Sequence, residues 1–387
     1  MTRPIRYGMV GGGPDAFIGA VHRRAARLDG EWTLVAGAFS SDATRSRAHG
    51  ASLGLDPSRA YGSWVAMLEG EAWLPADRRM EAVVIVTPNH LHFPIALGAL
   101  EAGFDVVCDK PLTTTLADAE ALVTRSRALD RVFCVTHNYT GYPMVKEARE
   151  RVAAGDLGDV RRVVVEYTQG WLRTLLEAEG QKQATWRGDP ERAGPSSALG
   201  DIGSHAHNLA GYVTGLAPTE LFADLGTVVP GRALEDDGTV LLRYASGARG
   251  LLTASQISTG ERNHLRLRVY GSEGALDWLQ ERPDRLRLVA PSGVETILYD
   301  GVDGLSPRAA AHLRLPGGHP EGFIEAFANL YRNVARTLRT RRDGGGGGPF
   351  DDDFPTVEDG ARGVHFIETA VASAAAGRWL DAGWSPP

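Results

Sequence analysis

Residues 5–13 have the sequence Ile-Arg-Tyr-Gly-Met-Val-Gly-Gly-Gly, and a helix-like segment follows at residues 17–28. The apolar run predicts a buried β-strand, and the glycines predict a tight turn before the helix. Glycines at this point let a backbone approach a pyrophosphate, which sits at a helix N-terminus where free N–H groups and the helix dipole favour negative charge. The next glycine, Gly19, comes late, so the loop is longer than in the usual motif. A tight turn without a ligand is the alternative interpretation.

The first 140 residues alternate between strand-like and helix-like segments. Residues 82–86 are apolar and mostly β-branched, which is typical of a strand buried on both faces. Further strands are expected at 5–10, 32–39, 105–108 and 132–136, with helices at 17–28, 92–102 and 116–129. Strands separated by helices predict a parallel, doubly wound sheet, here an N-terminal Rossmann domain at residues 1–140.

The pattern changes after residue 140. Helices are expected at 143–154, 198–213, 323–337 and 364–376, and strands at 160–169, 221–229, 239–244, 249–258, 265–270 and 275–278. Successive short strands without long helices between them indicate a mostly antiparallel sheet. We therefore expect an α/β protein whose second domain, residues 141–387, is of the α+β type. Arg341-Arg342-Asp343 and the glycines at 344–348 are expected to form a flexible loop without evident chemistry.

The composition limits the classes of partner. The 387 residues are 43% hydrophobic and 23% charged, as in ordinary globular proteins, and the net charge is −7. This balance argues against nucleic acid or an anionic membrane as the main partner. The sequence shows neither the apolar region of a signal peptide nor a membrane-length apolar stretch, so we expect a cytoplasmic protein. Cys108 and Cys134 fall in expected strands, which predicts buried thiols and no disulfide framework.

The end of the second expected strand bears on the choice between NAD and NADP. An acidic residue there usually binds the ribose 2′-hydroxyl of NAD, but this chain has Phe39 and Ser40, with Asp42 slightly later. Ser40, Ser41 and Arg45 suit a 2′-phosphate instead. The alternative is that Ser41 or Asp42 caps a helix.

Polar residues follow the next two strands. Thr87-Pro88-Asn89-His90 comes after residues 82–86, and Asp109-Lys110-Pro111 after residues 105–108. Both runs come at the carboxyl end of a strand, and ligands of open α/β sheets bind at that edge of the sheet. A lysine among apolar segments can have a lowered pKa, which suits proton transfer, although taken alone Lys110 would be a surface lysine. The alternative for His90 and His92 is that they are simply polar residues at the start of a helix, and for His92 we prefer this alternative.

The run Gly200-Asp201-Ile202-Gly203-Ser204-His205 adds a carboxylate and an imidazole. Their i,i+4 spacing places both side chains on one face of a helix. A carboxylate can orient hydroxyl groups, and a neutral imidazole can accept a proton near neutral pH. The alternative is a capping aspartate and a packed histidine. No spacing of His or Cys supports a metal site.

Taken in order, these motifs resemble the Gfo/Idh/MocA family, the group of glucose–fructose oxidoreductase and inositol dehydrogenase. The resemblance covers nearly the whole chain, with Asp109 where the family normally has Glu. It implies a bound NAD or NADP, with NAD favoured, and an open sheet in the second domain that assembles homodimers or homotetramers. The long first loop and residues 316–322 are similar to the levoglucosan and glycoside 3-dehydrogenase branch.

By position, the resemblance implies that Lys110, Asp201 and His205 are catalytic and contact the substrate. It also implies roles for His137, Tyr139 and His319 in substrate binding. The implied cofactor-binding residues are Gly11, Gly13, Phe17, Ile18, Ser40, Ser41, Arg45, Thr87, Pro88, Asn89, His92, Asp109, Lys110, Asn138, Trp186 and Arg187.

The expected activity is oxidation of a secondary hydroxyl group of a sugar, anhydrosugar, glycoside or cyclitol. His205 would remove the hydroxyl proton with support from Lys110, and the rate would rise with pH through a pKa near that of histidine. One alternative is a glycosidase-like enzyme that uses transient oxidation by tightly bound NAD. Another is a non-catalytic, dinucleotide-binding regulatory protein.

Overall fold

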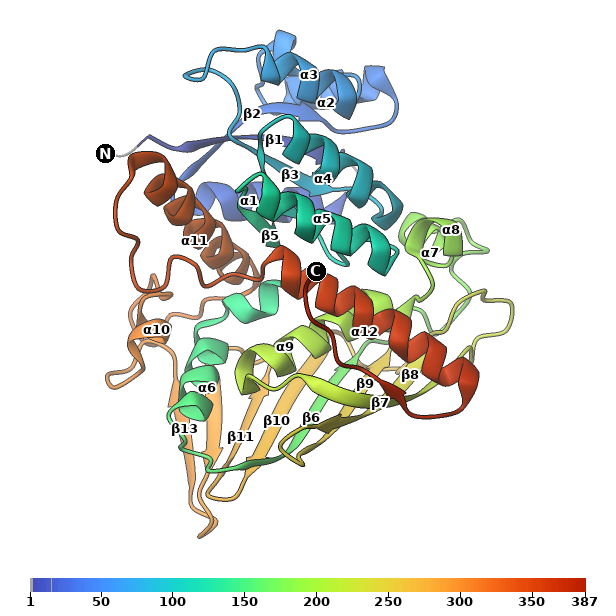
Figure 1. The fold of residues 1–387 in the computed structure, drawn as a ribbon, viewed down its shortest axis with the longest axis vertical. Helices are drawn as coiled ribbons and strands as arrows, with labels where there is room; N and C mark the ends of the chain where they lie inside the picture. The colour runs from blue at the N-terminus through green and yellow to red at the C-terminus, as the bar shows by residue number, and fades with distance from the viewer. Residues whose placement is uncertain (1–2, 15) are drawn as a thin grey trace.

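The computed structural model describes residues 3–14 and 16–387, which form two sheets joined by helices (Figure 1). The first sheet has the order β2-β1-β3-β4-β5, and all of its neighbouring strands pair in parallel. Its strands are β1 (Ile5–Gly11), β2 (Trp32–Ala38), β3 (Ala82–Val86), β4 (Asp105–Cys108) and β5 (Phe133–Val135). This is the predicted doubly wound sheet, and β3 is buried along its whole length.

Helices connect these strands, which places every strand's carboxyl end at one edge of the sheet. The helices are α1 (Phe17–Leu28), α2 (Ala43–Ser52), α3 (Trp64–Ala72), α4 (His92–Glu101) and α5 (Leu116–Ala128). Asp42 is the N-cap of α2, since its side chain accepts a hydrogen bond from the Arg45 backbone N–H at 2.8 Å. Cys108 and Cys134 are buried free thiols, as predicted.

The second sheet has nine strands in the order β13-β12-β11-β10-β6-β9-β8-β7-β14. These are β6 (Val160–Thr168), β7 (Pro218–Gly226), β8 (Asp237–Tyr244), β9 (Arg249–Ser255), β10 (His264–Gly271), β11 (Ala275–Leu279), β12 (Arg285–Val289), β13 (Glu295–Tyr299) and β14 (Leu380–Asp381). All neighbours are antiparallel except β6 and β9, which are parallel. The predicted, mostly antiparallel sheet is confirmed.

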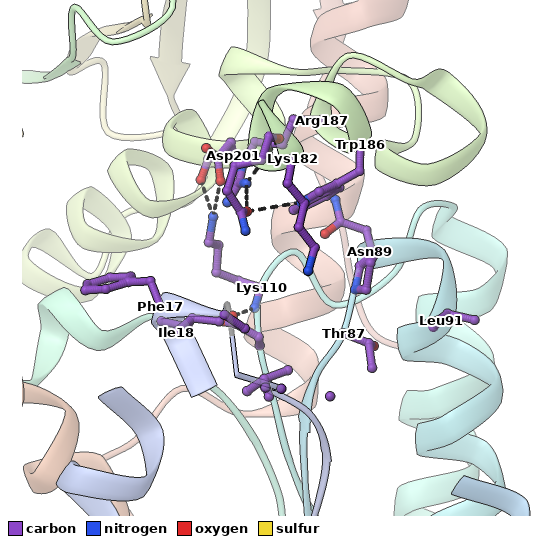
Figure 2. A pocket seen from close by; sticks show the side chains of 18 of the residues that line it. Phe17, Ile18, Thr87, Asn89, Leu91, Lys110, Lys182, Trp186, Arg187 and Asp201 are labelled. Atoms are coloured by element: carbon purple, nitrogen blue, oxygen red, sulfur yellow. Dashed lines mark hydrogen bonds and ion pairs between the residues drawn. The ribbon is translucent and has the colours of Figure 1, made fainter. Parts of the chain in front are cut away.

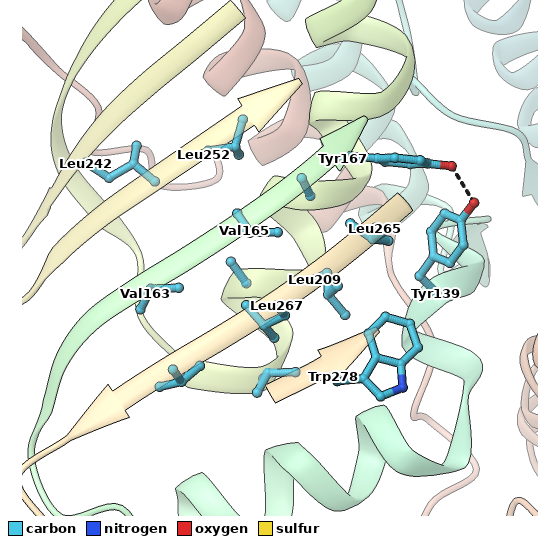
Figure 3. Packing of buried hydrophobic residues seen from close by; sticks show 14 of the residues in the cluster. Tyr139, Val163, Val165, Tyr167, Leu209, Leu242, Leu252, Leu265, Leu267 and Trp278 are labelled. Atoms are coloured by element: carbon cyan, nitrogen blue, oxygen red, sulfur yellow. Dashed lines mark hydrogen bonds between the residues drawn. The ribbon is translucent and has the colours of Figure 1, made fainter. Parts of the chain in front are cut away.

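Helices cover one face of this sheet (Figure 1). They are α6 (Pro143–Ala153), α9 (Ser204–Thr214) and α12 (Val357–Ala376). Alternate residues such as Val165, Leu267 and Trp278 point into the core beneath them (Figure 3). Residues of the opposite register, including Leu241 and Tyr270, are exposed on the outer face.

The last long helices connect both sheets. Helix α11 (Phe323–Asp343) packs against α1, and the Trp32 indole donates a hydrogen bond to the Tyr331 carbonyl at 2.8 Å. Helix α12 contacts both α5 and β7. The division of the chain at residue 140 therefore stays a prediction.

Two sequence expectations in this region were wrong in detail. Arg341, Arg342 and Asp343 belong to α11, which ends where Gly344 adopts a left-handed conformation at φ 68°. Helix α12 begins at Val357 instead of residue 364, because Thr356 and Asp359 form a capping box. Three short helices were not predicted: α7 (Lys182–Arg187), α8 (Pro190–Ala193) and α10 (Pro307–Ala310).

Within the described ranges, the structure contains no helix with the length and apolar character needed to span a bilayer.

Candidate functional site

A cleft of about 1470 Å³ lies at the carboxyl edge of the first sheet, between that sheet and the second one. Figure 2 shows side chains reaching into it from both parts of the chain. The cleft is lined by most of the sequence-predicted residues: Gly11, Gly13, Phe17, Ile18, Ser40, Ser41, Arg45, Thr87, Pro88, Asn89, Asp109, Lys110, Asn138, Tyr139, Trp186, Arg187, Asp201 and His205.

The glycine turn after β1 forms the floor of one end of the cleft. Gly11 and Gly12 have φ values of 85° and 68°, which other residues rarely adopt. A Cβ atom on Gly13 would lie 2.8 Å from the Phe39 carbonyl oxygen, so no side chain fits there. The turn therefore has no side chains between its backbone and the cleft, a geometry that lets a pyrophosphate approach the start of α1.

Unpaired polar atoms support the same interpretation. Thr87 Oγ1 and Asn138 Nδ2 are buried without a hydrogen-bond partner, and both residues line the cleft. Buried polar groups normally have partners, so such atoms beside a cleft indicate a bound ligand. Asn89 is different, because its amide donates to the Ala193 carbonyl at 2.9 Å and so holds α8 against the first sheet.

The end of β2 presents hydroxyl groups and no free carboxylate. Ser40, Ser41 and Arg45 line the cleft, while Asp42 is engaged as the cap of α2. The capping interpretation of Asp42 is confirmed, and the two serines remain available to a ribose or its phosphate.

Lys110 and Asp201 form the charged centre of the cleft. The Lys110 ammonium donates to Asp201 Oδ1 at 2.7 Å and to the Asp201 carbonyl at 2.6 Å. Arg187 Nε and Gln256 Nε2 donate to the other carboxylate oxygen, Oδ2, at 3.1 and 2.9 Å. Burial would raise the pKa of Asp201, but the charges of Arg187 and Lys110 outweigh it and hold the pKa well below its usual range. The carboxylate therefore stays ionised.

The backbone around Asp201 differs from the expected regular helix. Residues Leu199–Gly203 form a π-helical turn, in which the Ser204 N–H donates to the Leu199 carbonyl, and α9 begins at Ser204. Such turns occur often at functional sites. The turn brings the Asp201 carbonyl, as well as its carboxylate, to Lys110, and His205 still faces the same cleft.

His205 is nearly buried among aromatic rings. Its ring lies 4.8 Å from that of Tyr139 and 5.4 Å from that of His137, both edge to face. Burial and the charge of Lys110 lower the pKa of His205 well below its usual value. The imidazole is thus neutral at neutral pH and able to accept a proton.

Three predicted site residues lie outside the lining of the cleft. The His92 ring nitrogens are 2.8 and 2.9 Å from the Pro111 and Thr87 carbonyls, so this histidine ties two strand ends together. His137 is buried behind His205. His319 is exposed and contacts its own turn, with Nδ1 3.0 Å from the Pro316 carbonyl. His137 Nδ1 is buried without a hydrogen-bond partner. The roles of these three histidines in binding cofactor or substrate stay predictions.

Several lining residues were not predicted from the sequence. They include Tyr167, Gln169, Lys182, Gln183, Asn263 and Phe323. Gln169 immediately follows β6, and Asn263 immediately precedes β10, so polar residues at strand ends were the available signal.

Within residues 3–14 and 16–387, no cluster of three or more His, Cys, Asp or Glu side chains could hold a metal ion.

Comparisons with known proteins agree with this geometry. The profile of the oxidoreductase family with an NAD-binding Rossmann fold matches residues 5–137, and that of the GFO/IDH/MocA C-terminal domain matches residues 145–277. An uncharacterised oxidoreductase of Bacillus subtilis is 33% identical and aligned over 98% of both chains. Levoglucosan dehydrogenase of Pseudarthrobacter phenanthrenivorans is 26% identical over 97% of this chain and 98% of its own.

A solved structure is also similar over almost the full length. The inositol dehydrogenase homologue of Azotobacter vinelandii, complexed with NADH and myo-inositol, superimposes with a TM-score of 0.91. It is 37% identical and the match covers 98% of each chain. The chain is therefore a member of the Gfo/Idh/MocA family of oxidoreductases and has that family's NAD-binding Rossmann fold.

Proposed function

We propose that the protein oxidises a secondary ring hydroxyl group of a cyclitol, sugar or anhydrosugar, with NAD as the hydride acceptor. One observation carries this proposal: Lys110, Asp201 and His205 line the same cleft as the glycine turn after β1. Two relatives support this substrate class: the inositol dehydrogenase homologue that is complexed with myo-inositol, and levoglucosan dehydrogenase.

The residues divide the chemistry between them. The Lys110 ammonium, held by Asp201, donates a hydrogen bond to the substrate oxygen and stabilises the negative charge that develops there. His205, neutral at neutral pH, accepts the hydroxyl proton. When bound, the nicotinamide ring takes the electron pair of the carbon-bound hydrogen as hydride. The carbon thereby becomes a carbonyl.

A substrate panel tests this activity. Inositols, monosaccharides, glycosides and levoglucosan are each mixed with enzyme and free NAD, and NADH is followed by its absorbance. We expect net NADH formation with at least one of them. Consumption of a glycoside without net NADH would instead support transient oxidation, and NAD binding without turnover of any substrate would support a regulatory protein.

We further propose a homodimer or homotetramer assembled through the outer face of the second sheet. Leu241, Tyr270 and Ile297 are exposed there by 42%, 39% and 43%. Such a face is commonly covered by a partner subunit. Light scattering at micromolar concentration should report at least a dimer, and a monomer would contradict this proposal.

A further inference from the structure

Gln256 lies directly behind the charged centre, at the end of β9. It is 0% exposed and is not among the residues that line the cleft. Its backbone N–H donates to the Asp236 carbonyl at 2.9 Å, and its carbonyl accepts from the Leu172 N–H at 3.0 Å. These bonds fix the backbone of Gln256 on both sides, so its side chain leaves a rigid support.

The side-chain amide of Gln256 has a defined orientation. Nε2 donates to Asp201 Oδ2 at 2.9 Å and approaches Gln169 Oε1 at 3.4 Å. Both neighbours are acceptors, so only the NH₂ end of the amide can face them. The amide therefore joins the charged centre to the neighbouring polar wall.

That wall consists of Tyr139, Tyr167, Gln169 and Asn263, which we call the amide–phenol wall. Gln169 Nε2 and the Tyr167 hydroxyl both donate to Asn263 Oδ1 at 2.7 Å. The hydroxyls of Tyr139 and Tyr167 are 2.5 Å apart and point toward one another (Figure 3). Asn263 Nδ2 also donates to the Tyr139 hydroxyl at 3.2 Å. All four residues line the cleft, so they present amide and phenol groups to a polyhydroxylated ring.

We propose that Gln256 is a positioning residue of the active site, an inference that rests on the proposed function. Its amide fixes Oδ2 of Asp201 and so turns Oδ1 toward Lys110. Through Gln169 it also sets the distance between this ion pair and the amide–phenol wall. The reacting hydroxyl and the other hydroxyls of the substrate are thus received by one connected set of hydrogen bonds.

The requirement for an amide follows from the charges that meet at this point. Asp201 is ionised, Lys110 and Arg187 are its two cationic partners, and His205 and Tyr167 lie nearby in the cleft. A carboxylate at position 256 would face the Asp201 carboxylate directly. Two carboxyl groups in contact, one of them at a fully buried position, cannot both ionise freely, so one of them has a raised pKa and the pair titrates as a unit.

Two substitutions of similar volume separate this role from simple packing. Gln256→Met removes the donor without adding charge. Gln256→Glu keeps the shape, and its protonated form can still donate to Asp201, whereas its ionised form repels Asp201. If the residue only fills space, Gln256→Glu should be the milder change at every pH.

The first measurement uses the full-length protein without cofactor or substrate. Melting temperatures are recorded between about pH 5.5 and about pH 8, the range in which a raised carboxyl pKa titrates. We expect Gln256→Glu to lose stability relative to wild type as the pH rises. Gln256→Met should differ from wild type by a nearly constant amount.

The second measurement uses the wild-type enzyme's best substrate. We expect Gln256→Met to lower kcat/KM by about 10- to 100-fold at every pH, the range typical of an orienting partner. Gln256→Glu should be closest to wild type at the acidic end and decline as the pH rises. The Kd for NAD should stay within about threefold, since the amide contacts neither the glycine turn nor the β2 end.

A Gln256→Glu variant with wild-type pH dependence of melting and of kcat/KM would overturn the proposal. So would a Gln256→Met variant that retains wild-type kcat/KM. Failure of the wild type to reduce NAD with any substrate would refute the proposed function instead, and the melting data on the unliganded protein would still decide whether Gln256 orders the Asp201 carboxylate.

Discussion

The ammonium nitrogen of Lys110 is 2.7 Å from Oδ1 of Asp201, although the two residues are 91 positions apart in the sequence. The same nitrogen is 2.6 Å from the Asp201 carbonyl oxygen, so two acceptors of one residue hold it. The family resemblance implied that Asp201 binds substrate hydroxyls, and this stays a prediction. Lys110, Arg187 and Gln256 all donate to its carboxylate, so Asp201 also holds the lysine in place.

Replacement of Lys110 by Met should abolish most of the activity. The methionine has a similar length but no charge, so the substrate oxygen loses its cationic partner and Asp201 keeps only Arg187 and Gln256. We expect kcat to fall by about 10²- to 10⁴-fold, the usual range for a group acting on the reacting oxygen. Steady-state kinetics measure this effect, and a variant within threefold of wild type would refute the assignment.

The dependence of the wild-type rate on pH should differ from that of an ordinary histidine. Burial and Lys110 lower the pKa of His205, so its neutral form persists to more acidic pH. We expect kcat/KM to be nearly flat above about pH 6.5, the ordinary histidine value, and to fall only below it. His205→Ala should remove that acidic limb and lower kcat by about 10²- to 10⁴-fold. A limb centred at or above the ordinary value would contradict the structure.

Replacement of Gly13 by Val should prevent cofactor binding. The new Cβ would lie 2.8 Å from the Phe39 carbonyl, and the added methyl groups would enter the space beside the turn. We expect the Kd for NAD to rise more than tenfold, or about 1.4 kcal/mol, in a fluorescence titration. Gly226→Val is the matched control, because nothing lies within 4 Å of a Cβ there. Equal affinities in the two variants would show that the phosphate site is misplaced.

Buried neutral histidines should make the protein sensitive to acid. Burial lowers the pKa of His207 to about 3, and its ring stacks on Phe366 at 4.3 Å. Below the unfolded value of about 6.5 the unfolded chain binds a proton that the folded chain does not, so stability falls as the pH drops toward 3.

His207→Phe keeps an aromatic ring and removes this titration. Between about pH 6.5 and pH 4, the free energy of unfolding should fall less steeply for this variant than for wild type. The two slopes should differ by up to about 1.4 kcal/mol per pH unit. Denaturant titrations at several pH values provide the test. Identical slopes for the two proteins would mean that His207 is protonated in the folded state.

The elements predicted most accurately are those with unambiguous local patterns. β3 and β4 match their predicted bounds because they are short apolar runs with clear ends. Helix α2 was missed because its sequence is polar and shows little amphipathic periodicity. β13 was missed because most of its residues are exposed, so its sequence lacks the alternation of apolar and polar residues that marks a half-buried strand.

The residues themselves predicted part of the site where polar groups follow recognisable strands, and the family resemblance supplied others, such as Asp201 and His205. Thr87 directly follows β3 and Lys110 comes two residues after β4, so parallel pairing of the two strands brings both residues to one edge of the sheet. The π-helical turn at Asp201 was not predictable, because α- and π-helical turns share one apolar pattern over so few residues. Gln256 was missed because its role depends on the hydrogen bond to Asp201, a residue from a distant segment that only the folded structure brings close.

The transfer of deuterium from substrate carbon to the cofactor tests the central claim most directly. A substrate from the panel, deuterated at the carbon that bears the reacting hydroxyl, is oxidised by wild type and by Lys110→Met, and the reduced nicotinamide is examined by NMR or mass spectrometry. We predict that the wild type places the deuterium on the nicotinamide ring with a carbonyl product, and that Lys110→Met does so about 10²- to 10⁴-fold more slowly. Release of the deuterium into water, or equal rates for the two proteins, would contradict hydride transfer at the Lys110–Asp201 centre.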